Sequence, residues 1–494
     1  MKTLQYWGTG NFQEHPYTGR IVTWTEKEKQ TVDDAIATKL LAANAGFVLD
    51  NDESGEVVTS QINSVTGRIK VNSIPVEKVA GHVFACLGDS ISYQNTNGSS
   101  LSLRAQGYMT WAGILSGGRI VFDPAMNFGA SGENSTQVAA RVASVVAAAP
   151  EWCVVHCGTN DLYVGPVAYE MTIANLTTIY SALLAAGIRV VAMPIIPRAK
   201  DAASGSLPTA QRQQLHRINN WIRRTAALTP GIVLADPSLN IVDHSVTNGD
   251  PIGALTAAAT AYTVDGLHPA PRGAYYMGKS IADAVSSQLC PISYSPVSQQ
   301  DTYDATNNPT GNLLLNGFFT GTGGTAGTGA SGSLAASWQF RRSSGTTGTI
   351  GGSKTTKTVD NGTTYPMQQV VCSAAAGSTT ENMQVYQFVS TGFTANVDVI
   401  YAEIDVEVSG ITVDCVKSIQ LNLGDGTNTR ICAAEEAGFY LPNGNWSGTL
   451  RTPAFLIASG ASTLGFYLNI VLNGAVASNS VTVNCSRAAI RKVS

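Results

Sequence analysis

The sequence predicts an α/β domain built on a parallel sheet, followed by an all-β sandwich. Two observations predict this architecture. Between about residues 80 and 290, short apolar runs alternate with amphipathic stretches of helical period, as in βαβ units whose right-handed crossovers cover both faces of a sheet with helices. Beyond residue 310, short alternating runs are separated by Gly, Asn and Asp, which is the pattern of a β-sandwich.

Shifts in composition divide the 494 residues into four predicted regions. Residues 1–78 form a small N-terminal region that serves attachment or oligomerisation, and residues 79–290 form the α/β domain. Residues 291–309 are rich in Pro, Ser, Gln, Asp and Asn without periodicity, which indicates a linker. Residues 310–494 form the sandwich.

The α/β region contains five predicted strands and five predicted helices in alternation. The apolar, β-branched runs are typical of buried parallel strands, and the stretches between them have the 3.6-residue period of helices. The strands span 83–87, 119–122, 152–157, 189–193 and 232–235, and the helices span 107–115, 135–148, 167–186, 209–228 and 273–288.

The two flanking regions have weaker patterns. In the N-terminal region, apolar residues recur at helical spacing over 31–44, which predicts a helix that Gly46 ends. In the C-terminal region, the glycine-rich residues 321–332 predict a long mobile loop. The strand candidates after that loop include 383–388, 397–408, 418–423, 454–457, 464–471 and 481–485.

The composition excludes several classes of partner. Only 13% of the residues are charged and the formal net charge is -4, so there is no electrostatic reason to expect nucleic acid or an anionic membrane as partner. The N-terminus lacks an apolar signal segment and no run reaches about 18 apolar residues, so we expect a chain made in the cytoplasm without a signal peptide. Eight cysteines are too sparse for a disulfide framework.

A candidate nucleophile follows the first predicted strand. The apolar run 83–87 ends abruptly in Gly88-Asp89-Ser90, which would place the Ser90 hydroxyl at the carboxyl end of the strand, where open α/β sheets bind ligands. Alone, the triplet could equally mark a turn whose serine only caps a helix. Its interpretation therefore depends on the residues that follow.

Three further groups of polar residues lie at strand ends or loops of the same pattern. Gly132 comes just before a predicted helix, where its backbone amide can face an anion. Asn160 and Asp161 follow the third predicted strand and present a carboxamide donor at the same edge of the sheet. Asp265 and His268 are three residues apart, so one turn can bring the carboxylate to the imidazole N–H.

Together these residues supply what acyl transfer needs. A serine hydroxyl is a poor nucleophile until a base takes its proton, and His268 is the candidate base, with Asp265 fixing its tautomer. The backbone amides of Ser90 and Gly132 and the side chain of Asn160 would stabilise the oxyanion. We expect neither a metal nor another cofactor in this scheme.

The four blocks resemble the SGNH (GDSL-type) hydrolase family over about residues 80–290. The matching blocks are Gly88-Asp89-Ser90, Gly132, Gly158-x-Asn160-Asp161 and Asp265-x-x-His268-Pro269. Ile91 stands where Leu is usual, which is a conservative departure. The resemblance implies a three-layer, flavodoxin-like domain with esterase activity.

The same resemblance implies the roles of the site residues. Ser90 is then the nucleophile, and it contributes to the oxyanion hole with Gly132 and Asn160. Asp265 and His268 are the acid and the base of the triad. Asp89 and Asp161 have supporting roles.

Competing assignments of the site are weaker. An α/β-hydrolase elbow needs Gly-x-Ser-x-Gly, and Ser92 occupies the last position here. Cys153 and Cys157 suggest zinc, but on a strand they lie about 13 Å apart with His156 on the other face. His244, beside an aspartate, is the only rival base, and adjacent residues of an extended chain face opposite ways.

Two looser resemblances concern the flanking regions. Residues 312–319, followed by Trp338, resemble the opening of jelly-roll carbohydrate-binding modules, although a generic sandwich for oligomerisation fits equally. Residues 19–47 are similar to segments of phage and prophage structural proteins. The aromatic residues that could stack on sugar rings or belong to the core are Tyr365, Tyr440 and Trp446.

The sequence thus predicts a serine esterase that removes small acyl groups, O-acetyl above all, from a bacterial surface polysaccharide as part of a phage tail fibre or spike. The expected location is the virion, or the medium after lysis, and the expected assembly is a homo-oligomer, a trimer by analogy, with other virion proteins. One alternative is a lipase, thioesterase or phospholipase. Another is a receptor-binding adhesin without catalytic activity.

Overall fold

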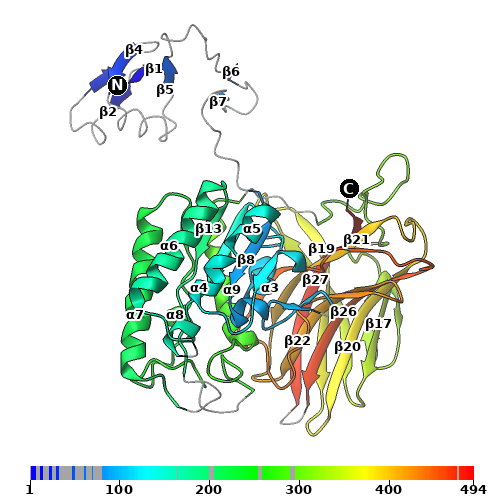
Figure 1. Cartoon of the computed structure of the whole chain (residues 1–494). Helices are drawn as coiled ribbons and strands as arrows, with labels where there is room; N and C mark the ends of the chain where they lie inside the picture. The colour runs from blue at the N-terminus through cyan, green and yellow to red at the C-terminus, as the bar shows by residue number, and fades with distance from the viewer. Residues whose placement is uncertain are drawn as a thin grey trace. The chain divides into compact units, whose positions relative to one another are not determined.

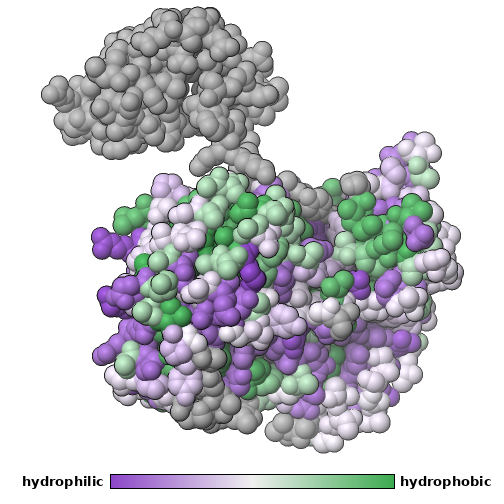
Figure 2. Space-filling view, viewed as in Figure 1, coloured by the Kyte–Doolittle hydropathy of each residue, from purple (hydrophilic) through white to green (hydrophobic). Residues whose placement is uncertain are grey.

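The computed structural model describes residues 81–98, 100–163, 165–199, 205–253, 259–289, 295–474 and 478–493, together with seven short strands before residue 80 (Figure 1). The chain divides into two compact units, Met1–Val79 and Ala80–Ser494. No described helix is long and apolar enough to cross a membrane. The face shown in Figure 2 mixes hydrophilic and apolar side chains over the second unit.

The N-terminal unit contains a three-stranded antiparallel sheet in the order β4-β1-β5. The predicted helix over 31–44 begins too early, because Thr31 and Val32 lie in strand β4 (Lys29–Val32), as suits β-branched residues. The rest of that prediction lies outside the described residues. The other strands are β1 (Lys2–Tyr6), β2 (Phe12–Glu14), β3 (Val22–Trp24), β5 (Phe47–Asp50), β6 (Gln61–Ile62) and β7 (Ile69–Lys70).

The predicted α/β fold is confirmed. A five-stranded sheet has the order β11-β8-β12-β13-β14 and every neighbouring pair is parallel, which is the 2-1-3-4-5 order of flavodoxin-like domains. Its strands are β8 (Phe84–Gly88), β11 (Asn127–Gly129), β12 (Trp152–His156), β13 (Arg189–Ala192) and β14 (Ile232–Leu234).

Helices cover both faces of this sheet (Figure 1). Alternate residues of β8 divide between the two cores: Phe84 and Cys86 lie in one, and Ala85 and Leu87 lie in the other. The first core includes α2 (Ser90–Tyr93), α3 (Tyr108–Leu115), α8 (Ser238–Ile241) and α9 (Pro271–Val285), and the second includes α4 (Ser135–Ala140), α5 (Val142–Ala148), α6 (Tyr169–Ala185) and α7 (Thr209–Leu228).

Two predictions within this domain are wrong. Residues 119–122 make only an isolated bridge, between Val121 and Val83, and the edge strand is β11 instead. Gly129 lets β11 lie against α2, because a Cβ there would lie 2.1 Å from the backbone nitrogen of Tyr93. The helix predicted over 135–148 is divided at Arg141 into α4 and α5.

The C-terminal region is confirmed as a sandwich of two mainly antiparallel sheets. One has the order β15-β17-β20-β26-β22-β23 and the other β16-β18-β19-β27-β21-β24, with β25 beside β21. The strands are β15 (Gly323–Ala326), β16 (Ala330–Gly332), β17 (Leu334–Ser344), β18 (Thr349–Thr358), β19 (Thr364–Ala374), β20 (Thr380–Val389), β21 (Val399–Ser409), β22 (Val416–Gly424), β23 (Thr429–Cys432), β24 (Trp446–Arg451), β25 (Phe455–Leu456), β26 (Leu464–Asn473) and β27 (Asn479–Lys492).

The glycine-rich residues 321–332 are not the predicted loop. They form β15 and β16, which pair in parallel with β17 and β18 at the edges of the two sheets. Small residues let this segment lie close to its neighbours: a Cβ on Gly324 would meet the carbonyl oxygen of Ala335 at 2.4 Å. The small residues here allow tight backbone packing. The composition alone did not distinguish a closely packed edge strand from a mobile loop.

The α/β domain and the sandwich share a hydrophobic core. Trp111 of α3 packs edge to face on Trp446 of β24 and on Tyr275 of α9, with ring centroids 5.3 Å apart in each pair. Trp446 is therefore a core residue and no platform for a sugar ring. Trp338 likewise stacks on Phe319 inside the sandwich, at 4.3 Å between centroids.

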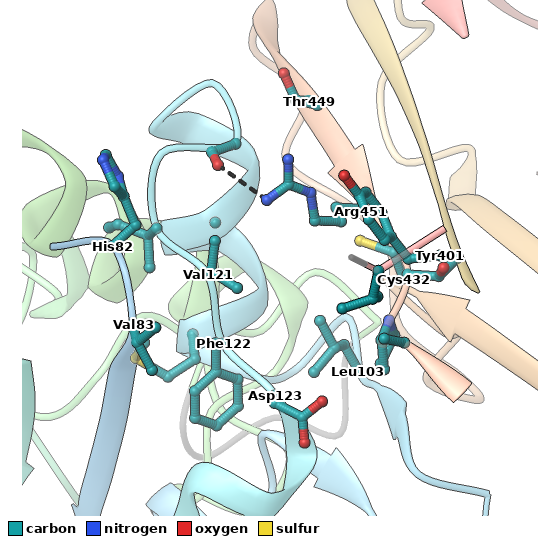
Figure 3. A pocket seen from close by; sticks show the side chains of 18 of the residues that line it. His82, Val83, Leu103, Val121, Phe122, Asp123, Tyr401, Cys432, Thr449 and Arg451 are labelled. Carbon is teal, nitrogen blue, oxygen red and sulfur yellow. Dashed lines mark hydrogen bonds between the residues drawn. The ribbon is translucent and has the colours of Figure 1, made fainter. Parts of the chain in front are cut away.

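A cleft of about 760 Å³ opens between the two domains. Figure 3 shows Val83 and Phe122 on the α/β side and Tyr401 and Arg451 on the sandwich side. Arg451 donates from Nη1 to a backbone carbonyl of the α/β domain, that of Gly118, at 3.4 Å. Two of the lining residues, Val83 and Glu151, directly precede β8 and β12, so the cleft lies at the end of the sheet where its strands begin.

Candidate active site

Ser90 lies at the opposite end of the sheet, where the strands finish, two residues after the last residue of β8. It is the first residue of α2, and Asp89 caps this helix by accepting the backbone N–H of Ile91 on Oδ1 at 3.0 Å. Asp89 is fully buried, and this burial raises its pKa to about 7. The cap therefore fixes the direction of the helix and places a carboxyl group of shifted pKa beside Ser90.

Ser90 is hydrogen-bonded to His268, 178 residues later in the chain. The Ser90 Oγ lies 2.8 Å from His268 Nε2, and His268 Nδ1 lies 2.7 Å from Asp265 Oδ2. The other oxygen of Asp265 accepts the backbone N–H groups of His268, at 2.8 Å, and Leu267, at 3.0 Å. Burial opposes the ionisation of Asp265, but these hydrogen bonds and the nearby imidazole outweigh it and keep its pKa below the usual value.

Asp265 and His268 sit on a short hairpin. Its two sides are joined by hydrogen bonds from Val264 N–H to the His268 carbonyl, at 2.8 Å, and from Ala270 N–H to the Tyr262 carbonyl, at 3.0 Å. We call residues 262–270 the catalytic hairpin. At its tip Gly266 has a φ of +85°, a conformation that favours glycine. The backbone rather than side-chain packing thus sets the distance from Asp265 to His268.

The structure brings Asn160 to the loop that contains Gly132. Asn160 Nδ2 donates to the carbonyl of Glu133 at 2.8 Å, which uses one of the two N–H groups of the amide. Gly132 has a φ of +80° and is solvent-exposed, with open space where a Cβ would be. The N–H of Ser90, at the first position of a helix, has no intrahelical acceptor.

Asp161 is a predicted supporting residue. In the part of the chain that the structure describes, the hydrogen bonds of its carboxylate connect elements of the fold. Its Oδ1 accepts the Ser135 N–H at 2.7 Å, and its Oδ2 accepts the hydroxyls of Ser135 and Thr172. Asp161 therefore joins the start of α4 and the first turn of α6 to the segment that follows β12.

Two buried or half-buried arginines of the site were not predicted. Arg141 donates to the carbonyls of Gly88, at 3.0 Å, and Phe128, at 2.8 Å, and pairs with Glu133. Arg198 donates to the Thr159 carbonyl at 2.8 Å. Both hold the strand ends that present the site residues. No local pattern identifies them, because their partners are distant in sequence.

The rejected candidates lie apart from this constellation. His156 is buried in β12, and burial lowers its pKa to about 4. Burial raises the pKa of the Cys153 and Cys157 thiols. His244 Nε2 contacts the Leu239 carbonyl at 2.9 Å. In the described part of the chain, no three His, Cys, Asp or Glu residues are grouped to hold a metal ion.

A serine, an imidazole and a carboxylate in one hydrogen-bonded chain, at the carboxyl edge of a flavodoxin-like sheet, define a serine hydrolase of the three-layer α/β class. Residues 86–275 match the model of the GDSL-like lipase/acylhydrolase family. This part of the chain is a GDSL-like acylhydrolase domain, and the protein is a carboxylic ester hydrolase, which confirms the predicted family and enzyme class.

Solved structures of the same kind are similar to the domain. A GDSL-like lipase from Bacteroides thetaiotaomicron is 21% identical, with a TM-score of 0.33, and the match covers 42% of this chain and 90% of that one. A lipase/acylhydrolase from Enterococcus faecalis is 18% identical, with a TM-score of 0.33 and coverages of 43% and 99%. A carbohydrate esterase of family 3 from Talaromyces cellulolyticus is 18% identical, with a TM-score of 0.30 and coverages of 43% and 99%. No curated protein sequence matches the chain.

Proposed function

We propose that the protein removes small acyl groups, O-acetyl above all, from a carbohydrate, and that the natural substrate is a bacterial surface polysaccharide. The observation that supports the hydrolytic part is the hydrogen-bonded chain from Ser90 through His268 to Asp265, with distances of 2.8 and 2.7 Å. Those distances are within the reach that proton transfer needs.

In the first half of the reaction, Ser90 Oγ attacks the ester carbonyl carbon while its proton passes to His268 Nε2. Asp265 accepts the N–H of Nδ1 and stabilises the imidazolium that forms. The tetrahedral intermediate then collapses: the C–O bond to the sugar breaks, and the imidazolium returns the proton to the leaving alcohol. The acyl group stays on Ser90 as an ester.

The oxyanion of each tetrahedral intermediate needs hydrogen-bond donors. The candidates are the backbone N–H groups of Ser90 and Gly132 and the N–H of Asn160 that does not bind the Glu133 carbonyl. In the second half of the reaction, water gives its proton to His268 and attacks the acyl carbon. Collapse of that intermediate breaks the bond to Ser90 Oγ and releases the acid, and the imidazolium returns its proton to Oγ, which restores the Ser90 hydroxyl.

The position of the apolar interdomain cleft favours a polar alcohol over a lipid. The apolar interdomain cleft has none of Ser90, Asp265 and His268 among its lining residues. A long acyl chain bound in that cleft would therefore not reach the nucleophile.

The test measures acetate released from acetylated bacterial polysaccharides by the wild type and by Ser90→Ala. Hydrolysis of p-nitrophenyl acetate and of a long-chain ester is measured in parallel. We expect acetate release that disappears in the variant, which should retain the wild-type melting temperature. Cleavage of the long-chain ester alone would favour a lipase, and no cleavage of any substrate would favour a binding protein.

The biological setting is part of the same proposal. A place in a phage tail fibre or spike, a homotrimer and sugar binding by the sandwich stay predictions. They are supported by the sequence resemblances over residues 19–47 and 312–319. The retained Ser90, Asp265 and His268 argue for an enzyme rather than an inert adhesin.

A further inference from the structure

We propose that the β-sandwich positions the catalytic hairpin, and that Arg272 is the residue through which it does so. This inference rests on the proposed function, because it assigns a role relative to His268. It makes the sandwich a working part of the esterase in addition to any binding that it performs.

The base of the catalytic hairpin is in contact with the sandwich. Tyr440, in the loop between β23 and β24, donates its backbone N–H to the Ala259 carbonyl at 3.2 Å. Arg272, four residues after His268, approaches the Thr260 carbonyl with Nη1 at 3.5 Å. The segment just before the hairpin, residues 259–260, thus contacts both the sandwich, through Tyr440, and Arg272, which follows the hairpin. We call the contacts of these residues the hairpin base region.

Arg272 connects that region to the sandwich with its remaining hydrogen-bond donors. Its Nη2 is 2.5 Å from Asp414 Oδ1 and 3.3 Å from Asn443 Oδ1, and its Nε is 3.3 Å from the Leu441 carbonyl. Asn443 is itself fixed, because its Nδ2 donates to Asp414 Oδ1 at 2.9 Å. The guanidinium therefore lies in a polar pocket built by two sandwich loops.

Because Arg272 is buried, its charge depends on the partner that Asp414 provides. The Arg272 side chain is only 9% exposed, although it lies at the start of α9 and carries a charge. Asp414 is 35% exposed; burial opposes its ionisation, but the hydrogen bonds from Arg272 and Asn443 hold its pKa below the usual value. A buried charge without its partner is costly, so this geometry is retained only while the sandwich supplies the partners.

The catalytic hairpin has little tolerance for displacement. The two hydrogen bonds of His268 have lengths of 2.7 and 2.8 Å, and a misplacement of about 1 Å can reduce a rate by about a hundredfold. Ser90 is on a different element, α2, so movement of the hairpin changes the Ser90–His268 distance directly. Loss of the Arg272 contacts would therefore reduce the chemical step more than substrate binding.

A second ion pair between the same two domains provides a matched control. Arg104 Nη2 and Glu436 Oε2 lie 2.7 Å apart, with side chains 29% and 20% exposed. Arg104 follows β10 (Ser102–Leu103) and has no contact with the catalytic hairpin in the described structure. Both pairs connect the α/β domain to the sandwich, and Glu436 belongs to the same β23–β24 loop as Tyr440, but only Arg272 lies on the segment that directly follows the hairpin.

The experiment compares Arg272→Gln and Asp414→Asn with Arg104→Gln and Glu436→Gln in the full chain. Four quantities are measured: kcat and KM for p-nitrophenyl acetate, the rate at which phenylmethylsulfonyl fluoride inactivates the enzyme, and the melting temperature. We expect Arg272→Gln to lower kcat and the inactivation rate by about tenfold or more, with KM within about twofold. We expect Asp414→Asn to have a smaller effect in the same direction, and the control pair to leave all three rate parameters unchanged.

Equal losses in both pairs of variants, or a loss in KM alone, would overturn the proposal, because either result would indicate general domain docking. Arg272→Lys keeps a charge for Asp414 and should recover part of the lost kcat if Arg272→Gln folds poorly. Ser90→Ala separates this proposal from the proposed function. If Ser90→Ala stays active the site assignment fails, whereas if Ser90→Ala is inactive and Arg272→Gln is fully active only the positioning role fails.

Discussion

The carboxylate of Asp161 accepts the backbone N–H of Ser135 at 2.7 Å and the hydroxyl of the same residue, although the two lie 26 positions apart. Ser135 is the first residue of α4, so Asp161 sets where that helix begins relative to the end of β12. The loop before α4 contains Gly132, and Asn160 precedes Asp161. One carboxylate thus fixes the relative position of two candidate oxyanion donors.

Replacement of Asp161 should therefore affect both folding and rate. We expect Asp161→Ala to lower the free energy of unfolding by about 1–3 kcal/mol, since it leaves buried donors unpaired. We expect kcat to fall while KM changes little, because the donors would act in the transition state. Urea titrations and steady-state kinetics measure the two effects. Unchanged kcat in a folded variant would show that α4 keeps its position without Asp161.

Asn160 should contribute more to rate than to stability. We expect Asn160→Ala to reduce kcat by about 10²–10³, the usual cost of one oxyanion donor. Asn160→Asp, which keeps the shape but replaces the amide by a carboxylate, should reduce kcat at least as much. Steady-state kinetics on p-nitrophenyl acetate measure both variants. A variant of either kind with the wild-type kcat would remove Asn160 from the oxyanion hole.

Asp89 and His156 should give the stability opposite dependences on pH. Burial raises the pKa of Asp89 from 3.8 to about 7, so the folded state retains a proton that the unfolded chain releases, and stability falls as pH rises through this window. Burial lowers the pKa of His156 from 6.5 to about 4, so the unfolded chain binds a proton that the folded state excludes, and stability falls as pH decreases through that window.

Single variants should separate these two dependences. We expect Asp89→Asn to make the protein more sensitive to acid between about pH 4 and 6.5, and His156→Leu to leave a stability that decreases towards pH 7. The free energy of unfolding from urea titrations across this range measures both slopes. An Asp89→Asn variant with the wild-type slope would indicate that Asp89 ionises as an ordinary carboxyl group.

The shared core predicts that the α/β domain and the sandwich unfold together. Trp111, Ile114 and Ala274 of the first belong to the same cluster of buried residues as Trp446 of the second. We expect a single calorimetric transition for residues 80–494, and Trp446→Ala to lower its stability by about 3–5 kcal/mol. Two well-separated transitions in the wild type would contradict cooperative unfolding of the two domains. A Trp446→Ala substitution that destabilises only one of the two domains would contradict it as well.

The sequence patterns predicted the main elements because buried parallel strands and amphipathic helices leave strong periodic signals. Ser90 could be placed by its position after such a strand. The edge strand β11 was missed, because Asn127 and Gly129 are poor strand formers, and the missing Cβ of Gly129 lets this strand lie close to the backbone of α2. Local propensity was overridden by a tertiary contact.

The residues that hold the site were harder to predict than the residues that form it. Ser90, Asp265 and His268 lie in short motifs whose chemistry can be read locally. Arg272 and Asp414, in contrast, are 142 positions apart, and neither has a pattern that indicates the other. Such pairs depend on how two domains dock, and one sequence contains no direct record of that docking.

The apolar surface between the domains also limits how this protein can be rearranged. In a protein whose modules are joined only by a flexible tether, gene fusion can exchange one module for another without loss of solubility. Here an isolated hydrolase would expose the indole of Trp111 and the neighbouring Ile114 to water. Any natural or designed recombinant that gives this enzyme a new sandwich must therefore preserve the surface of β24 that faces α3, so the two parts are inherited as one piece.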